Sequence, residues 1–306
     1  MRRLFLWLAE NPWLRKRLPR LWFVRRAVRR FLPGEDATSA LNAGARFDAN
    51  GIRTIYTRIG EHVTGRSEAA AVADHYLGLL DAFHDRSLEG EISVKLSQLG
   101  LEVDPGGALD HCRRLVVRAG ELGSRVWIDM EDSRTTDATL DVFMRLRADH
   151  AAVGVCLQAY LHRTAADLQR LLPMEPAIRL VKGAYAEPES IAFQSRRAVD
   201  ASFAGLAAMM LEARRSGRSS WLALGTHDLS LIEQTDHHAR AIGLARTAYE
   251  VQMLYGVRED QQLRLAAEGY QVADLISYGE AWYPWYMRRL AERPANVLFA
   301  IRQIFG

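Results

Sequence analysis

An apolar run ends on a charged turn in "AIRLVKGAY" (177–185), and seven other runs of the chain resemble it. Two core-type residues lie between Arg179 and Lys182, and Gly183 ends the run. Ammonium and guanidinium groups are not interchangeable. Lysine is also rare here: of 40 Lys and Arg residues, the lysines are Lys16, Lys95 and Lys182. The lysine therefore indicates a functional strand end; the alternative is a solvated lysine that caps a strand.

Runs of this kind recur from residue 52 onward and alternate with segments of helical character. The runs span residues 52–61, 91–98, 125–132, 153–160, 177–185, 221–228, 247–254 and 273–279. Between them, segments such as "EAAAVADHYLGLLDAF" (68–83) place apolar residues three or four positions apart, which is the period of a helix packed on one face. Repeated strand–helix units require parallel strands, and eight of them predict a closed (β/α)8 barrel, a TIM barrel of the α/β class.

Polar residues lie at the carboxyl end of nearly every run. In a parallel barrel these ends meet at one mouth, where the active sites of such folds lie. Packing alone does not explain so many polar ends, so the sequence predicts an enzyme site. The residues are Glu61, Lys95, Asp129, Gln158, Lys182, Thr226, His227, Gln252 and Tyr278.

The sequence lacks the motifs of several other kinds of active site. We find no His/Cys cluster with zinc-ligand spacing, no G-x-S-x-G elbow and no Walker loop, so no metal is predicted. The two cysteines, Cys112 and Cys156, are far apart and indicate a reducing compartment, which we take to be the cytoplasm. No stretch approaches the roughly 20 apolar residues that span a bilayer.

The first 30 residues carry a strong positive charge. They contain nine arginines and Lys16 but only one acidic residue, Glu10, and Trp and Leu residues lie between these charges in the sequence. We expect residues 1–46 to form a basic N-terminal helical segment and residues 47–306 to form the barrel. Residues 1–30 either contact an anionic membrane, here its inner face, or pack on the barrel as a lid. Nucleic acid is disfavoured, because no DNA-reading motif accompanies the charge.

The segment "WYPWYMRRLAERPAN" (282–296) predicts a final helix with one charged face. Arg288 and Arg289 lie on that face and could bind a carboxylate through parallel hydrogen bonds, if the helix covers the barrel mouth. The alternative is a solvated helix end on which Arg288 pairs with Glu292.

Seven motifs, taken together and in order, resemble the monofunctional bacterial proline dehydrogenases. They are "VKLSQLG", "WIDMEDS", "LQAY", "RLVKGAY", "GTHD", "YEVQMLYG" and "YPWYMRRLAERPAN", and the resemblance covers roughly residues 50 to 300. It implies a distorted (β/α)8 barrel with FAD at the mouth and a final helix over the substrate. It also implies oxidation of L-proline to 1-pyrroline-5-carboxylate in proline catabolism, with electrons passing to a quinone.

The resemblance also implies roles for individual residues. Asp129 matches the active-site aspartate, and Arg179 matches the arginine at the flavin N5–O4 edge. Glu61 matches a glutamate that pairs with Arg288 and gates the site. The substrate would be held by Lys95, Arg288 and Arg289 and walled by Tyr185 and Leu254. The residues that match FAD contacts are Met130, Gln158, Arg179, Lys182, Gly183, Ala184, Thr226 and His227.

One departure from the family pattern concerns the substrate. The family usually has Tyr-x-Pro-Tyr-Gly on the eighth strand, whereas this chain has "LISYG" (275–279). Leu275 therefore replaces an aromatic residue that packs on the substrate, and Ser277 replaces the proline. Hydroxyproline or another cyclic imino acid is the alternative substrate. A non-catalytic barrel that serves as a scaffold is the alternative from another class, and the intact Lys95, Asp129 and Arg179 argue against it.

Overall fold

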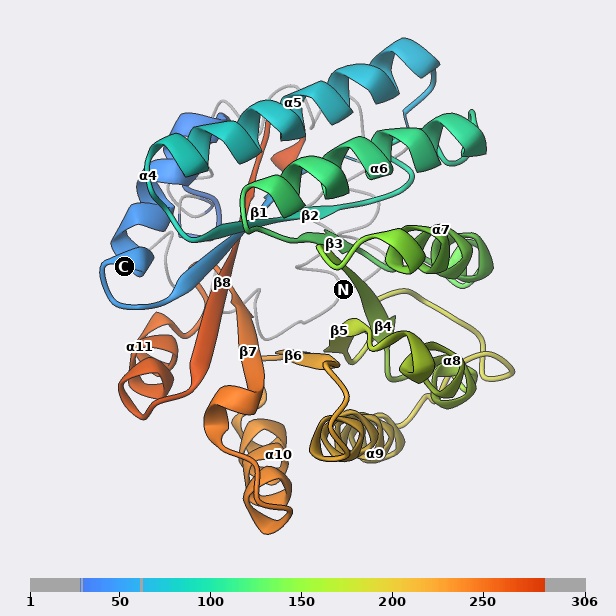
Figure 1. Ribbon diagram of the computed structural model, residues 1–306, viewed down its shortest axis with the longest axis vertical. Coiled ribbons are helices and arrows are strands. Elements are labelled where there is room, and N and C mark those ends of the chain that lie inside the picture. The colour runs from blue at the N-terminus through green and yellow to red at the C-terminus, as the bar shows by residue number, and fades with distance from the viewer. Residues whose placement is uncertain (1–27, 29, 61–62, 284–306) are drawn as a thin grey trace.

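The computed structural model describes residues 28, 30–60 and 63–283 of the chain. Eight parallel strands form a closed ring in chain order, and β1 pairs with β8 to complete it (Figure 1). The predicted (β/α)8 barrel is confirmed. The strands are β1 Arg53–Arg58, β2 Gly90–Val94, β3 Val126–Ile128, β4 Val153–Gln158, β5 Ala177–Val181, β6 Trp221–Gly225, β7 Tyr249–Leu254 and β8 Gln271–Tyr278.

Each strand from β1 to β7 is followed by a helix on the outside of the ring, as right-handed parallel crossovers require (Figure 1). Two short 3-10 helices, η2 (Leu172–Met174) and η3 (Arg246–Ala248), complete the connections to β5 and β7. The crossover helices are α5 Arg66–Asp85, α6 Pro105–Glu121, α7 Thr136–Asp149, α8 Thr164–Leu171, α9 Arg196–Arg215, α10 Leu229–Ala241 and α11 Glu259–Ala267.

The main hydrophobic core lies between the ring and these helices. Alternate residues of each strand point outward, and residues such as Val94, Ile128 and Leu180 pack there against helix residues. The inside of the ring holds a smaller apolar cluster of Ile55, Trp127, Ala177, Ala223 and Ala273, with Leu275 beside it. Much of the remaining interior is therefore polar. Its buried members include Glu91, Ser93, Arg179, Glu250 and Gln252.

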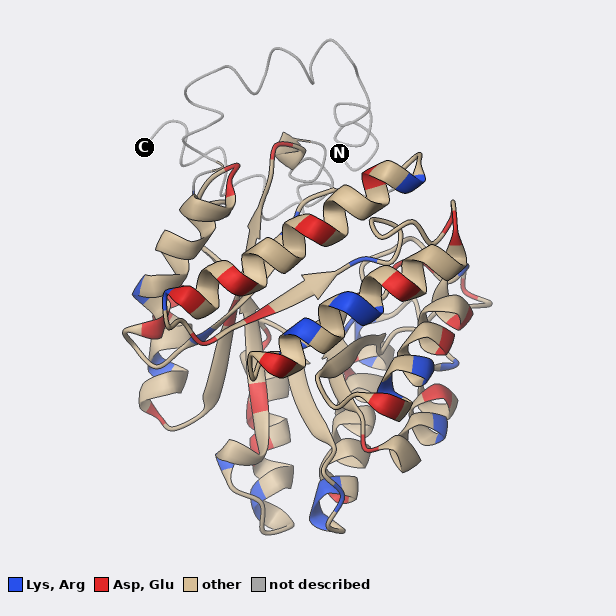
Figure 2. Cartoon of the chain, turned by 45° about the horizontal axis from the view of Figure 1, so that its top comes forward, with Lys and Arg blue, Asp and Glu red and all other residues tan. Residues whose placement is uncertain are grey.

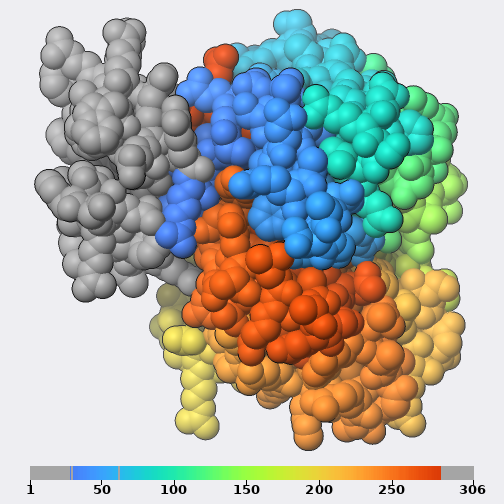
Figure 3. Space-filling model, turned by 90° about the vertical axis from the view of Figure 1, so that its left-hand side faces the viewer, coloured from blue at the N-terminus to red at the C-terminus, as the bar shows by residue number. Residues whose placement is uncertain are grey.

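Helix α4 (Ala37–Asp48) precedes the barrel and packs against β1 and β8. Figure 3 shows it in blue against the orange and red surface of the last described elements. It spans the position between residues 46 and 47, at which the sequence suggested a domain boundary. Because its buried residues contact the barrel wall, α4 covers the place where the ring closes.

The helices begin where the sequence supplies capping residues. Asp104 accepts a hydrogen bond from the Gly107 amide at 3.1 Å, and Pro105 occupies the first turn of α6, where its missing N–H costs nothing. Ion pairs join the exposed faces of α5 and α6: Arg114 with Asp74 and Arg118 with Asp81, each at 2.7 Å. Figure 2 shows these two helices side by side, with acidic positions in red on α5 and basic positions in blue on α6. Within the described residues, no helix is both long and apolar enough to cross a membrane.

The strands from β1 to β7 are shorter than the apolar runs that predicted them, whereas β8 begins two residues before its run. The run 125–132 gives only the three residues of β3, because the carbonyls of Met130 and Glu131 bond to the side chain of Gln158 instead of a neighbouring strand. Polar residues at the ends of the runs therefore lie in loops at the mouth.

Candidate active site

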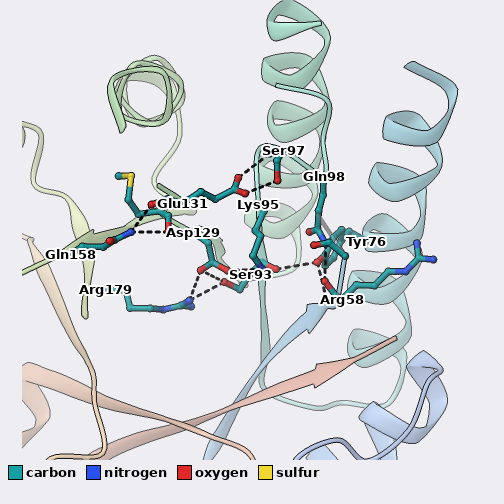
Figure 4. A network of polar contacts seen from close by, with 12 residues as sticks. Arg58, Tyr76, Ser93, Lys95, Ser97, Gln98, Asp129, Glu131, Gln158 and Arg179 are labelled. Carbon is teal, nitrogen blue, oxygen red and sulfur yellow. Dashed lines mark hydrogen bonds and ion pairs between the residues drawn. The ribbon is translucent and has the colours of Figure 1, made fainter. Parts of the chain in front are cut away.

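Three of the predicted site residues meet at the barrel mouth. Arg179 Nη1 lies 2.9 Å from Asp129 Oδ1, and Lys95 Nζ lies 3.9 Å from Asp129 Oδ2 (Figure 4). The Arg179 side chain is only 4% exposed, while those of Lys95 and Asp129 are 18% and 21% exposed. The arginine thus lies at the floor of the mouth, with the other two nearer to solvent. One carboxylate between two cations leaves a net positive charge, which suits an anionic ligand.

Three inward-facing residues fix the Arg179 guanidinium: Gln252, which the sequence placed at a strand end of the mouth, and Ser93 and Trp127, which sequence reasoning did not assign to the site. Ser93 Oγ accepts from Nη1 at 2.8 Å and donates to Asp129 Oδ1 at 2.8 Å. Gln252 Oε1 accepts from Nε at 2.6 Å, and the Trp127 ring lies 4.8 Å from the guanidinium carbon. Ser93 and Trp127 each lie two positions before a predicted site residue. The two-residue period of a strand could therefore have identified them.

Side chains also tie the mouth loops to one another, as Figure 4 shows. Ser97, in the loop after β2, donates through its amide and its hydroxyl to the Glu131 carboxylate, at 3.0 and 2.6 Å. Gln98 Nε2 donates to the carbonyls of Arg58 and Gly60, and Gln158 Nε2 donates to those of Met130 and Glu131. These contacts join the ends of β1 to β4 and fix the loops that carry Lys95 and Asp129.

The ammonium group of Lys182 is held by two carboxylates. It donates to Asp200 Oδ1 at 2.5 Å and to Asp228 Oδ2 at 2.8 Å, which joins the turn after β5 to α9 and to the start of α10. Burial tends to raise the pKa of Asp228, but hydrogen bonds from Lys182, Ser230 and Arg196 outweigh burial and lower the pKa well below 3.8. Lys182 therefore has a clear structural role in addition to the predicted cofactor contact.

The turn after Lys182 depends on a glycine. Gly183 has φ of +114°, and a Cβ at this position would lie 2.2 Å from the Tyr160 ring. Only glycine fits here without strain. The turn places Ala184 and Tyr185 at the surface, with Tyr185 38% exposed.

The predicted residues of β6 to β8 lie on the other side of the mouth. The Leu254 amide donates to His227 Nε2 at 3.3 Å, and Thr226 Oγ1 accepts from the Asp228 amide at 3.2 Å. Leu254 and Leu275 are register partners on β7 and β8, and both are half-buried. Two hydrophobic side chains therefore share one wall of the mouth.

One strand-end residue does not face the mouth. Tyr278 is 1% exposed, and its hydroxyl lies 2.7 Å from His75 Nε2 on α5. Strand alternation turns its side chain outward, into the helix layer, so its position as a mouth residue was wrong. Glu61, Arg288 and Arg289 lie outside the described residues, as does the predicted final helix. In the part of the chain that the structure describes, no three His, Cys, Asp or Glu side chains group as metal ligands.

Among the described residues, the buried polar atoms of the site that have no hydrogen-bond partner include two that lie close to the charged residues. They are Arg179 Nη2, a donor, and Gln158 Oε1, an acceptor. Buried groups of this kind are normally satisfied. Gln158 ends β4 and Arg179 lies on β5 at the floor of the mouth, so the pair indicates a ligand with matching groups.

The closed parallel ring and its charged mouth define a (β/α)8-barrel protein with an enzyme-type site. The family model for proline dehydrogenase matches residues 40–302. Proline dehydrogenase 1 of Bacillus subtilis (strain 168) is 34% identical over 304 residues, which cover 99% of both chains. Proline dehydrogenase of Deinococcus radiodurans is 34% identical over 307 residues, covering 98% of this chain and 96% of that protein. The chain belongs to the proline dehydrogenase family and is an oxidoreductase of that family.

Solved structures of two longer proteins share the fold. The crystal structure of proline utilization A from Bdellovibrio bacteriovorus, inactivated by N-propargylglycine, matches with a TM-score of 0.82 at 20% identity. Proline utilization A from Bradyrhizobium japonicum matches with a TM-score of 0.76 at 20% identity. These matches cover 94% and 92% of this chain but only 36% and 32% of the longer ones, so the chain spans about a third of each.

Proposed function

We propose that this chain oxidises L-proline to 1-pyrroline-5-carboxylate with FAD bound at the barrel mouth, and that a quinone receives the electrons. The arrangement of Lys95, Asp129 and Arg179 carries this proposal, together with curated relatives named as proline dehydrogenases over the full length. The Lys95 ammonium lies near the buried Arg179, and two cations balanced by one carboxylate suit a small substrate that carries a single carboxylate. Proline catabolism is the role that follows.

The residues of the mouth fit FAD. The isoalloxazine ring has both carbonyl acceptors and an N–H donor, which match the free Arg179 Nη2 donor and the Gln158 Oε1 acceptor. The missing Cβ of Gly183 lets the Tyr160 ring pack against the turn, which fixes the backbone that carries Ala184 at the mouth. We assign Met130, Gln158, Arg179, Lys182, Gly183, Ala184, Thr226 and His227 to the cofactor. When bound, FAD supplies the acceptor for the hydride of the substrate.

Lys95 would bind the substrate carboxylate, with Arg288 and Arg289 as its partners and Glu61 as the gate that pairs with Arg288. Asp129 would orient Lys95 and Arg179. It is not suited to remove the amine proton, because Oδ1 already accepts two hydrogen bonds and Oδ2 faces Lys95. We infer that the substrate gives this proton to solvent. Arg179 would keep a positive charge beside the redox edge of the cofactor, where negative charge develops.

A membrane-surface location would bring the site close to a quinone. Arg30 Nε donates to the Gly256 carbonyl at 3.2 Å, so the described end of the basic N-terminal segment lies against the loop after β7, at the mouth. The sequence of residues 1–30 supports contact with the anionic inner face of a membrane by an otherwise cytoplasmic protein.

Product analysis tests the proposed reaction. FAD-loaded protein is incubated with L-proline and a soluble quinone, and the product is identified by mass. We expect a cyclic imine that is two hydrogens lighter than proline, and none from D-proline. Failure to form this product in protein that retains FAD would contradict the proposal.

A second candidate substrate is a cyclic imino acid with a substituted ring, such as hydroxyproline. The observation that favours it is the apolar wall that Leu275 forms with Leu254 and Ile55. A leucine leaves more space than an aromatic residue and offers no hydroxyl. A substrate panel tests this candidate.

A further inference from the structure

The Arg179 guanidinium is held at two of its three nitrogens. Ser93 and Asp129 accept hydrogen bonds from Nη1, while Gln252 Oε1 accepts from Nε at 2.6 Å. Contacts at Nη1 alone would leave the group free to turn about that point. Gln252 removes this freedom, because a planar fork held at two nitrogens has a fixed orientation. These contacts therefore also fix the direction in which the remaining nitrogen, Nη2, points.

Glu250 fixes the orientation of the Gln252 amide. Gln252 Nε2 donates to Glu250 Oε1 at 2.5 Å, and Arg53 forms an ion pair with Glu250 Oε2. Whether or not Glu250 carries a proton, an oxygen remains to accept from Nε2. The amide therefore presents its oxygen, and not its nitrogen, to Arg179. The opposite orientation would set a donor against the Arg179 Nε donor.

Gln252 acts from below the mouth. Glu250, Gln252 and Leu254 alternate along β7 and share its inward face, and Leu254 lies at the end of the strand. Gln252 is 3% exposed and Glu250 is 1% exposed, so neither is placed to touch a substrate. Their effect on the reaction must pass through Arg179.

We propose that Gln252, oriented by Glu250, is a positioning residue that fixes the Arg179 guanidinium for the cofactor edge. The inference rests on the proposed function, in which Arg179 lies beside the flavin. It assigns a role to the buried Glu250–Gln252 pair inside the barrel. Removing the Gln252 oxygen would let the cation turn away and would weaken stabilisation of negative charge on the reduced ring.

The test measures the flavin midpoint potential by equilibration with a reference dye, and the rate of flavin reduction by L-proline. We expect Gln252→Met to lower the potential and to slow reduction about tenfold, the size expected for one hydrogen bond to a charged group. Gln252→Asn, which shortens the side chain but keeps it polar, should change both quantities in the same direction and covers the case in which the Met variant does not fold.

The matched control is Gln262→Met. Gln262 is also a fully buried glutamine with two hydrogen bonds, which it donates to the carbonyls of Leu254 and Val257 on the outer side of the barrel. It should lose a similar amount of stability but leave the midpoint potential unchanged. An equal shift in potential for the Gln252 and Gln262 variants would overturn the proposal.

A double mutant tests whether Gln252 acts through Arg179. Arg179→Met should retain FAD and lower the potential, and adding Gln252→Met should then change nothing further. A second, equal fall in potential would overturn the positioning role. The dye measurement does not use proline, so a flavoprotein that proline fails to reduce would contradict the proposed function while leaving the positioning role open to the same test.

Discussion

At the scale of single residues, Asp129 balances the charge of the mouth. Its Oδ1 accepts from Ser93 and Arg179, while Oδ2 lies 3.9 Å from the Lys95 ammonium. Two cations against one carboxylate leave a site that attracts an anion, and the orientation of both cations depends on Asp129. Leu275, in contrast, contributes only volume to the opposite wall.

Leu275→Tyr tests what that wall selects. The added ring would fill space beside Leu254 and supply a hydroxyl, so we expect a lower Michaelis constant for L-proline and poorer use of hydroxyproline. Steady-state kinetics with both substrates measure the change in preference. A wild-type enzyme that already prefers proline strongly, with no change in the variant, would exclude a role for Leu275 in selection.

A second carboxyl group, that of Asp274, lies away from the mouth, in the layer between the ring and the helices. Asp274 is fully buried on the outer face of β8, and neither oxygen has a hydrogen-bond partner among the described residues. Gln262 lies nearby but donates to backbone carbonyls. Burial therefore raises the pKa of Asp274 well above 3.8. The folded protein keeps a proton that the unfolded chain releases.

This raised pKa predicts a pH dependence of stability. Above about pH 4 the unfolded chain binds fewer protons at this site than the folded protein, so the unfolding free energy falls as pH rises towards the folded pKa. Asp274→Asn removes this dependence. The unfolding free energies of the variant and the wild type are measured in urea at about pH 5 and about pH 8. The value for the variant, relative to that of the wild type, should be higher at about pH 8. An equal difference at both pH values would show that Asp274 is ionised in the folded protein.

The sequence could predict the charged residues of the mouth but not the groups that orient them. Lys95 and Asp129 are conspicuous because a charge lies near the end of an apolar run, and Arg179 because a charge lies inside one. Ser93 is unremarkable in sequence, and Gln252 is conspicuous there only as a polar residue near a strand end. Their contacts with Arg179 depend on side chains from other strands that meet inside the ring. Tyr278 shows the same limit, since its direction depends on strand register.

At the scale of secondary structure, the number of strands followed from periodicity, whereas their ends did not. Glutamine side chains take the place of strand partners at the mouth: Gln158 satisfies the carbonyls after β3, and Gln98 satisfies two carbonyls after or at the end of β1. Such contacts join residues 27 to 40 positions apart, and local propensity contains no signal for them.

The cap of α6 offers a test at this scale. Asp104→Ala removes the bond to the Gly107 amide and should cost about 1 kcal/mol of stability, lowering the melting temperature by a few degrees. Asp104→Ser keeps an acceptor and should restore most of the loss. The two variants are compared by thermal unfolding monitored by circular dichroism. Equal losses in both would mean that the ion pair of Asp104 with Arg66, and not the cap, provides the stability.

At the scale of the whole molecule, segments from both ends of the described chain meet near the mouth. Trp282 Nε1 donates to Glu35 at 2.9 Å, and Arg30 bonds to the loop after β7. The N-terminal part of the described chain is therefore held beside the site by these two hydrogen bonds.

Deleting residues 1–27 separates anchoring from catalysis. The deletion removes most of the basic residues but keeps Arg30 and its contact with Gly256. Each cation near an anionic surface is worth about 1 kcal/mol, so we expect binding to anionic vesicles to fall sharply at low salt while flavin reduction is unchanged. Vesicle co-sedimentation measures the first and stopped-flow absorbance the second. Undiminished vesicle binding would favour a lid on the barrel.

Anaerobic reduction of the bound cofactor tests most directly whether the barrel mouth is a flavin site that oxidises proline. Purified protein loaded with FAD is mixed with L-proline in the absence of oxygen, and the visible absorbance of the oxidised flavin is followed. We predict that L-proline bleaches the absorbance, that D-proline does not, and that Arg179→Met retains FAD but bleaches more slowly. A protein that binds no FAD, or whose bound flavin is bleached by dithionite but not by L-proline, would contradict the function proposed for this site.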